Sequence, residues 1–261
     1  MEEEVVHAAL GWSVFASMFL SLVLLSSGIV APYGRYSSVK SFNMSWGVPI
    51  NARLAWVVQE IPALAIPLAL WASSDSPAVK STPNCILLAL FCAHYFNRSV
   101  IFPLSIRGGK PTPLGVAFFA FTFCVCNGYL QGRYLTKFHT FPPEWLRSPC
   151  FLVGVGLMIF GAGVNIHSDH VLRNLRRPGE TGYKIPHGGM FRWVSGANFF
   201  GEIVEWSGFA LACGGATPAV IFAASTAFNI GPRAVQHHKW YTEKFKEAYP
   251  QGRKALIPYV W

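Results

Sequence analysis

Long apolar segments separated by short polar ones run through the whole sequence. The first segment, residues 8–31, contains no charged side chain. A helix needs roughly 17 to 25 apolar residues to cross a hydrocarbon core about 30 Å thick. Further apolar segments occupy residues 54–72, 83–103, 113–133, 150–170, 193–213 and 216–232. We therefore predict an all-α, multi-pass integral membrane protein with seven transmembrane helices.

Composition and the N-terminus agree with this class. Charged residues make up 13% of the chain, about half the fraction found in soluble domains. A removable signal peptide begins with a basic region, whereas this chain opens with Glu2, Glu3 and Glu4, so we expect a retained first helix. No repeat or long linker divides the sequence, and we expect a single domain over residues 1–261.

Basic residues predict the orientation in the membrane, because loops rich in Lys and Arg stay on the cytosolic side. With the N-terminus outside and the C-terminus cytosolic, only Lys80, Lys137 and Arg147 fall in outside loops. The inside segments then hold Arg35, Lys40, Arg53, Arg107, Lys110, Arg173, Arg176, Arg177, Lys184, Arg233, Lys239, Lys244, Lys246, Arg253 and Lys254.

The formal net charge of +9 is thus gathered on one face of the membrane. Membrane topology and attraction to anionic lipid head groups account for such a face. An anionic cofactor bound from the cytosol accounts for it equally. Nucleic acid is excluded as a partner, because the chain has no soluble basic domain to hold it.

Polar side chains recur at helical spacing in the last three apolar segments. An ionisable side chain inside a membrane costs several kcal/mol unless it faces a cavity or a partner, and residues four apart share one helix face. We expect three rows of polar residues to converge near the cytosolic ends of these helices. The rows are Asn165, Asp169, Arg173 and Arg176; Asn198, Glu202 and Glu205; and Arg233, His237 and Tyr241.

Each row also has a purely structural interpretation. Asp169 and Arg173 have the spacing of an ordinary i,i+4 ion pair, and a carboxylate such as Glu202 can simply bind a neighbouring helix. Residues 178–189 are rich in Gly and Pro, which let backbone amides approach phosphate, although an ordinary loop has the same composition. Neither G-x-G-x-x-G nor G-x-x-x-x-G-K-[ST] follows a predicted strand, so helix side chains must hold any dinucleotide.

A second group of polar residues lies in the N-terminal half of the chain. Gln59 and Glu60 fall inside the second apolar segment, and His94, Tyr95 and Arg98 fall inside the third. A neutral carboxyl group beside a tyrosine hydroxyl can polarise a carbonyl oxygen. A lone histidine such as His94 is more often a hydrogen-bonded residue of the core than a catalytic one.

Cysteines and glycines are interpreted as packing residues. The six cysteines lie in or beside apolar segments without a C-x-x-C pair, so we expect no metal site. Gly154, Gly156, Gly161 and Gly163 lie within the fifth segment, where small residues allow two helices to approach closely.

These patterns together resemble the steroid 5-alpha-reductase family. The resemblance extends over nearly the whole chain after residue 32 and is carried by Asn-Ile-His-Ser-Asp-His-Val-Leu-Arg-Asn-Leu-Arg at 165–176 and by Ser-Gly-Ala-Asn-Phe-Phe-Gly-Glu-Ile-Val-Glu-Trp at 195–206. Shorter matching stretches lie at residues 55–62, 94–98, 107–111, 182–186 and 253–258.

The resemblance implies NADPH-dependent reduction of the 4,5 double bond of a 3-oxo-4-ene steroid, such as testosterone or progesterone, to a 5-alpha-dihydro steroid. Hydride would reach C5, and Glu60 and Tyr95 would polarise the C3 carbonyl, with Gln59 and Arg98 lining the same substrate site. The residues implied for NADPH are Asn165, Asp169, Arg173, Arg176, Tyr183, Asn198, Glu202, Arg233, His237 and Tyr241.

The same resemblance implies that different parts of the chain bind the substrate and the cofactor. Residues 1–112 would form mainly the substrate half and residues 113–261 mainly the NADPH half. The steroid would enter from membrane lipid and NADPH from the cytosol. The membrane would be the endoplasmic reticulum in a eukaryote or the inner membrane in a bacterium.

The chain departs from the family pattern in its first apolar segment, which does not align residue by residue. Gln236 also stands where histidine is common, and Trp261 stands in place of phenylalanine. The alternatives are a membrane enoyl-thioester reductase, a methyltransferase using S-adenosylmethionine, and a seven-helix transporter or receptor. The paired features Gln59–Glu60 and His94–Tyr95 argue against the thioester enzyme, and the lack of internal repeats argues against a transporter.

Overall fold

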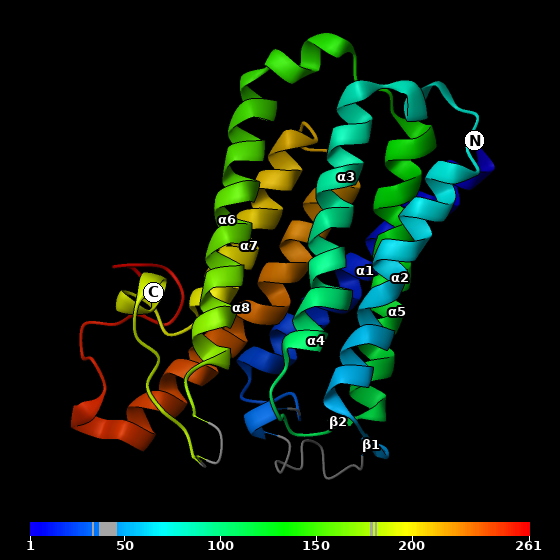
Figure 1. Ribbon diagram of the computed structural model, residues 1–261. Helices are drawn as coiled ribbons and strands as arrows, with labels where there is room; N and C mark the ends of the chain where they lie inside the picture. Colours follow the sequence, from blue (N-terminus) through cyan, green and yellow to red (C-terminus); the bar gives the residue numbers. More distant parts are fainter. Residues whose placement is uncertain (33, 37–45, 178–179, 181) are drawn as a thin grey trace.

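The computed structural model describes residues 1–32, 34–36, 46–177, 180 and 182–261, which form a bundle of long helices (Figure 1). The long helices are α1 (Glu2–Ser26), α2 (Ala52–Ala72), α3 (Thr82–Phe96), α5 (Leu114–Arg133), α6 (Pro149–Arg173), α7 (Ala197–Ala212) and α8 (Thr217–Phe245). Shorter elements are η1 (Gly34–Tyr36), η3 (Pro77–Lys80), η4 (Asn97–Ile101), α4 (Phe102–Ser105), η5 (Tyr134–Phe138), η6 (Pro143–Arg147), η7 (Gly189–Arg192) and η8 (Lys246–Ala248). The predicted all-α class is confirmed.

Five helical stretches in the described part of the chain are long and apolar enough to cross a membrane: 2–26, 52–72, 82–105, 114–138 and 149–173. Large apolar side chains on their outer faces are exposed, including Phe118, Phe119, Ile159 and Phe160. Helices α7 and α8 are not among the five. At about 1.5 Å per residue, the 16 residues of α7 span less than a full hydrocarbon core.

Several predicted segment ends were wrong. Residues 8–31 were expected as the first span, but α1 begins at Glu2 and ends at Ser26. Acidic side chains in the first helical turn are stabilised by the positive end of the helix dipole, so Glu2, Glu3 and Glu4 extend the helix. Residues 216–232 form only the first part of α8, which continues to Phe245.

The third apolar segment contains a change of helix type. Helix α3 leads directly into a π turn, η4, and α4 then continues to Ser105. A π turn inserts an extra residue into the helical repeat and is frequent at functional sites. Here it contains Arg98, so the side chain of Arg98 is turned relative to the register of α3.

Glycines hold α6 and α7 against each other. A Cβ atom added at Gly201 would lie 2.6 Å from the backbone nitrogen of Asn165, and one added at Gly208 would lie 2.5 Å from that of Met158. Gly154 and Gly161 make equally close backbone contacts with α7, whereas Gly156 and Gly163 have nothing within 4 Å. The packing prediction is therefore confirmed for Gly154 and Gly161 and wrong for Gly156 and Gly163.

A second close contact joins α2 and α5. Gly128 and Gly132, four residues apart on α5, face Pro62 and Pro67 inside α2. An added Cβ would lie 2.9 Å from the carbonyl oxygen of Pro62 in the first case and 2.9 Å from the Cα of Pro67 in the second. This small-xxx-small pair brings the backbones together and sets the distance between the helix that carries Glu60 and its neighbour.

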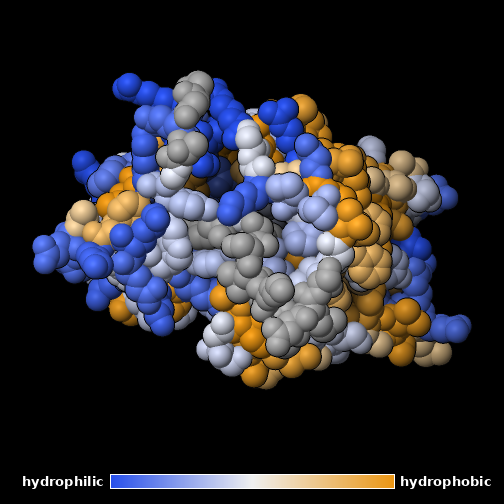
Figure 2. Space-filling model, turned by 90° about the horizontal axis from the view of Figure 1, so that it is seen from below, coloured by the Kyte–Doolittle hydropathy of each residue, from blue (hydrophilic) through white to orange (hydrophobic). Residues whose placement is uncertain are grey.

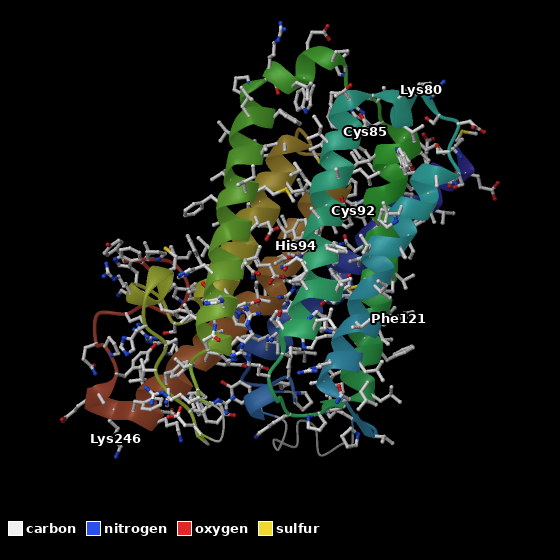
Figure 3. All side chains as sticks on the ribbon, viewed as in Figure 1. Lys80, Cys85, Cys92, His94, Phe121 and Lys246 are labelled. Carbon is white, nitrogen blue, oxygen red and sulfur yellow. The ribbon has the colours of Figure 1, made fainter. Side chains whose placement is uncertain are left out.

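The two ends of the bundle differ in polarity. Figure 3 labels Lys80 at one end and Lys246 at the other, and Figure 2, seen toward the second end, shows hydrophilic residues gathered there beside a hydrophobic flank. At this end the two-residue strand β1 (Pro49–Ile50) pairs antiparallel with β2 (Thr112–Pro113). Lys40, the Arg35 side chain, Pro178, Gly179 and Thr181 lie outside the described residues.

The C-terminal tail is anchored at the start of α7. The Ser195 backbone nitrogen donates to the Lys254 carbonyl (2.8 Å), and Ser195 Oγ lies 2.6 Å from both His238 Nδ1 and the Tyr249 hydroxyl. His238 belongs to the part of α8 beyond the predicted span. Burial, followed by the charges of Arg253 and Lys254, lowers the pKa of His238.

Gln236 on α8, which departs from the family pattern, forms hydrogen bonds with the end of α1 and the segment after it. Gln236 Nε2 donates to the carbonyl oxygens of Leu25 (2.9 Å) and Ile29 (2.8 Å). The last carbonyls of a helix have no partner within it, so Gln236 adds hydrogen bonds at the end of α1 and in the segment that follows it.

Candidate functional site

Tyr95 lies at the centre of the aromatic core. Its side chain is 3% exposed, and its ring stacks on the adjoining rings of Trp206 and Phe222, with centroids at 6.0 and 6.4 Å. The Tyr95 hydroxyl accepts a hydrogen bond from Asn127 Nδ2 at 3.1 Å. The phenol is therefore held rigidly, with its polar end turned toward α5.

Glu60 is brought near Tyr95 from α2. Its carboxylate accepts hydrogen bonds from Gln59 Nε2 (3.5 Å) and from the Cys124 thiol (3.7 Å). Cys124 lies one turn from Asn127, which bonds Tyr95, and Arg98 lies over the ring of Trp56, one turn before Glu60 on α2. The four residues predicted for the substrate site, Gln59, Glu60, Tyr95 and Arg98, thus come together inside the bundle.

Arg98 links this group to the first polar row. Its guanidinium donates to Asp169 Oδ2 at 3.1 Å, and both side chains are 10% exposed. The same guanidinium lies over the rings of Trp56 (4.7 Å) and Phe102 (4.5 Å). The ion partner of Asp169 is therefore Arg98 on the α3–α4 segment, and not Arg173 as an i,i+4 pair would require.

The first and second polar rows meet where α6 and α7 are closest. Asn165 Nδ2 donates to the Asn198 carbonyl (3.0 Å) and to Glu202 Oε2 (3.4 Å), and Asn198 also hydrogen-bonds Asp169. The close backbone approach at Gly201 makes these contacts possible. With the Arg98–Asp169 pair beside them, Asn165, Asn198 and Glu202 form a polar cluster within the bundle.

His94, marked in Figure 3 near the middle of the bundle, faces the same region. His94 Nδ1 donates to Glu205 Oε1 at 2.7 Å, and the two side chains are 6% and 2% exposed. The ring also contacts Trp206 edge-on, at 4.5 Å between centroids. This geometry matches the interpretation of His94 as a hydrogen-bonded core histidine.

Basic residues of the first row leave the buried region at the end of α6. Arg173 donates to His170 (3.3 Å), and Arg176 donates to the Gly182 carbonyl (3.4 Å). Among the described residues neither arginine has a carboxylate within 4.0 Å. Lys184, followed by the Arg177 backbone N–H, holds the pKa of Glu180 below its ordinary value, so the loop carries its own ion pair.

The third row packs against α7 and the C-terminal tail. The Arg233 guanidinium carbon lies 5.3 Å from the centroid of the Phe199 ring. The centroid of the His237 ring lies 5.4 Å from that of Phe199. Tyr241 is buried, and its ring stacks on Tyr249 at 5.5 Å. Tyr183 meets Trp240 edge-on at 4.8 Å, so these residues border the loop after α6.

One cavity lies away from these groups. It has a volume of about 820 Å³ and contains none of the predicted site residues. Its walls include Trp12, Leu130, Trp145, Pro218 and Ile221, at the end of the bundle where the chain begins (Figure 1). Within the described residues no three His, Cys, Asp or Glu side chains are grouped as metal ligands.

Sequence reasoning missed Asn127, Gln131 and Cys124, which adjoin Tyr95 and Glu60. Asn127 and Gln131 are polar, four residues apart and inside an apolar segment, so the rule applied to the other polar rows would have found them. A lone cysteine carries no such signal, because its ordinary role in an apolar helix is packing.

Known proteins are similar to this chain over most of its length. A family model described as 3-oxo-5-alpha-steroid 4-dehydrogenase matches residues 110–261. The chain is 53% identical over 232 residues to 3-oxo-5-alpha-steroid 4-dehydrogenase 1 of Bos taurus, covering 88% of each chain. It is 50% identical to the type 1 protein of Rattus norvegicus (93% of this chain, 90% of the relative). It is 45% identical to the type 2 protein of Sus scrofa (88% and 87%).

Proposed function

Because this chain belongs to the 3-oxo-5-alpha-steroid 4-dehydrogenase family, we propose that it uses NADPH to reduce the 4,5 double bond of 3-oxo-4-ene steroids of the testosterone or progesterone type. The observation that carries the proposal is the cluster of Glu60, Tyr95 and Arg98 inside the bundle, beside the polar rows of α6 and α7. The products are 5-alpha-dihydro steroids.

The substrate end of the site is Tyr95 with Glu60. The Tyr95 hydroxyl, supported by Glu60, donates a hydrogen bond to the C3 carbonyl oxygen, which gains negative charge as the enone is reduced. Hydrogen bonds and charges act strongly here because the groups are excluded from water. Gln59 donates to the Glu60 carboxylate, and Arg98 lies between the steroid site and the cofactor region, where it pairs with Asp169.

The donor set at the other end suits NADPH. Arg173 and Arg176 have no carboxylate within 4.0 Å among the described residues, and arginines bind phosphate through paired hydrogen bonds. Asn165, Asn198, Glu202 and Asp169 offer donors and acceptors for the sugar and amide groups. The remaining cofactor residues are Tyr183, Arg233, His237 and Tyr241. NADPH bound there supplies the hydride that C5 of the steroid receives.

The Arg98–Asp169 ion pair joins the two ends of the site. It connects the segment after Tyr95 to the helix of the cofactor row. A buried pair of this kind needs excellent geometry, because its desolvation is expensive. We propose that the Arg98–Asp169 pair holds the segment after Tyr95 at a fixed distance from α6, so that the steroid and the cofactor are aligned for hydride transfer to C5.

We also propose that α7 and α8 complete seven membrane crossings, with the N-terminus outside and the basic end cytosolic. Their packing within the bundle beside α6 supports this (Figure 1), as does the distribution of lysine and arginine. The relatives reported above come from mammals, which favours the endoplasmic reticulum as the compartment. Epitope tags at the two termini, probed before and after selective permeabilisation, test the orientation.

The test of the reaction is turnover by the detergent-purified protein. We expect NADPH oxidation with testosterone or progesterone and formation of the 5-alpha-dihydro product, reduced at least about 100-fold in Glu60→Gln and Tyr95→Phe while NADPH binding persists. Turnover of acyl-thioesters alone would instead identify an enoyl-thioester reductase and would overturn the proposal.

A further inference from the structure

A chain of hydrogen bonds runs from α8 to the Tyr95 hydroxyl. Gln131 Nε2 donates to the Pro218 carbonyl (2.8 Å) and to Asn127 Oδ1 (3.1 Å), and Asn127 Nδ2 donates to the Tyr95 hydroxyl (3.1 Å). Asn127 and Gln131 are each 2% exposed. No residue of this chain of bonds except Tyr95 was predicted as part of the site.

The Pro218 carbonyl fixes the direction of every bond in the series. A carbonyl oxygen only accepts hydrogen bonds, so Gln131 must turn its NH₂ group toward it. The same NH₂ group faces Asn127, which must therefore present its oxygen. The Asn127 NH₂ group is left facing Tyr95. Turning either amide over would bring two donors or two acceptors into contact.

The direction of these hydrogen bonds decides where the hydroxyl hydrogen of Tyr95 points. An amide NH₂ group only donates, so the phenol oxygen is the acceptor, and its own hydrogen points away from Asn127. We propose that Asn127 and Gln131 are positioning residues that keep the Tyr95 hydroxyl as a donor toward the steroid C3 carbonyl. This inference rests on the role proposed above for Tyr95.

Burial makes the arrangement stable. At 2–3% exposure, water does not compete for these amides, and hydrogen bonds in such surroundings strengthen one another. With Asn127 in place, the Tyr95 hydrogen has no acceptor on α5 and remains available. Without it, the hydroxyl rotates freely and must be oriented anew in each turnover.

The test is a double-mutant cycle between Asn127→Leu and Tyr95→Phe, read as kcat and KM for testosterone reduction with NADPH. In the background with Tyr95, we expect Asn127→Leu to lower kcat by about 10- to 100-fold, less than the loss of a whole donor, with NADPH affinity unchanged. In the Tyr95→Phe background the same substitution should change kcat by less than about twofold, because no hydroxyl remains to be oriented.

Controls separate positioning from folding. Gln131→Met, which frees Asn127 to turn over, should lower kcat less than Asn127→Leu and should also lose its effect in the Tyr95→Phe background. Thr122→Val on the same helix removes only a bond to the Phe118 carbonyl and should leave kcat unchanged. Gln131→Met gives the same cycle if Asn127→Leu does not fold.

The outcomes distinguish this inference from the proposed function. An Asn127→Leu effect that is equally large in both backgrounds would overturn the positioning role and leave the role of Tyr95 intact. A Tyr95→Phe protein with the kcat of the unmodified chain would overturn the role of Tyr95 itself, and the positioning role with it.

Discussion

The glycine contact between α6 and α7 predicts that Gly161→Ala moves the two rows of cofactor residues apart. The added methyl group would lie against the backbone nitrogen of Glu205, 2.5 Å from the Gly201 carbonyl oxygen and 2.7 Å from the Glu205 Cα. Ordinary van der Waals contact begins at 3.4 Å. All three atoms are backbone, so no side chain can rotate away and the helices must separate.

The magnitude follows from two opposing effects. Overpacking of a rigid contact costs about 1–3 kcal/mol, and the upper end applies here because backbone must move. Replacing glycine by alanine inside a helix recovers about 1 kcal/mol. The net loss is about 2 kcal/mol, which lowers Tm by about 4–8 °C for a chain of this size.

The same helix provides matched controls. Gly156 and Gly163 have nothing within 4 Å of an added Cβ, so Gly156→Ala and Gly163→Ala should gain up to about 1 kcal/mol. Tm is measured by intrinsic tryptophan fluorescence in one detergent, and NADPH affinity is measured beside it. We expect Gly161→Ala to lose stability and NADPH affinity together, because Asn165 contacts α7 one turn away.

The sign of the change in Tm decides whether α6 and α7 are in close contact at Gly161. If Gly161→Ala melts at or above the temperature of Gly163→Ala, the close contact between α6 and α7 is not present in solution, and the reasoning that places Asn165 against Asn198 fails with it.

Three further outcomes are expected. Gln236→Leu removes the hydrogen bonds to the carbonyls of Leu25, at the end of α1, and Ile29, just beyond it, and should cost about 1–3 kcal/mol, measured by thermal unfolding. Arg98→Met leaves the Asp169 charge buried and unpaired and should cost about 3–5 kcal/mol, with most of the loss recovered in the double variant Arg98→Met, Asp169→Leu. The pKa of His238 is lowered in the folded chain, so the unfolded chain binds the proton more readily; stability is complete above about pH 6.5 and falls as the pH drops below it. His238→Gln should flatten this dependence of Tm on pH, and an equally steep acid loss in that variant would refute the assignment.

Much of the fold could be predicted from hydropathy, because a membrane-spanning helix must be apolar over most of its length. The ends of α1 and α8 could not. Charged residues at Glu2–Glu4 extend α1 beyond its apolar core, and the polar end of α8 is held by the C-terminal tail through Ser195 and His238. Contacts far apart in the sequence decide these ends, and a local pattern does not contain them.

In the site, too, local spacing predicted part of the arrangement, and contacts between distant residues decided the rest. Helical spacing correctly grouped Asn165 with Asp169, but spacing alone also suggested Arg173 as the ion partner. The π turn at Arg98 and the close packing at Gly201 decide in favour of Arg98. Asn127 could have been found from the sequence, because it is a polar residue in an apolar helix. The orientation of its amide could not, because it depends on the Pro218 carbonyl in another helix.

The most direct test of the proposed reaction is the fate of deuterium from NADPH labelled at the transferred position of the nicotinamide. The purified protein is supplied with this NADPH and testosterone, and the product is examined by NMR and mass spectrometry. We predict a 5-alpha-dihydro product that carries one deuterium at C5. A product with deuterium at another carbon, or no steroid product despite bound NADPH, would contradict the account.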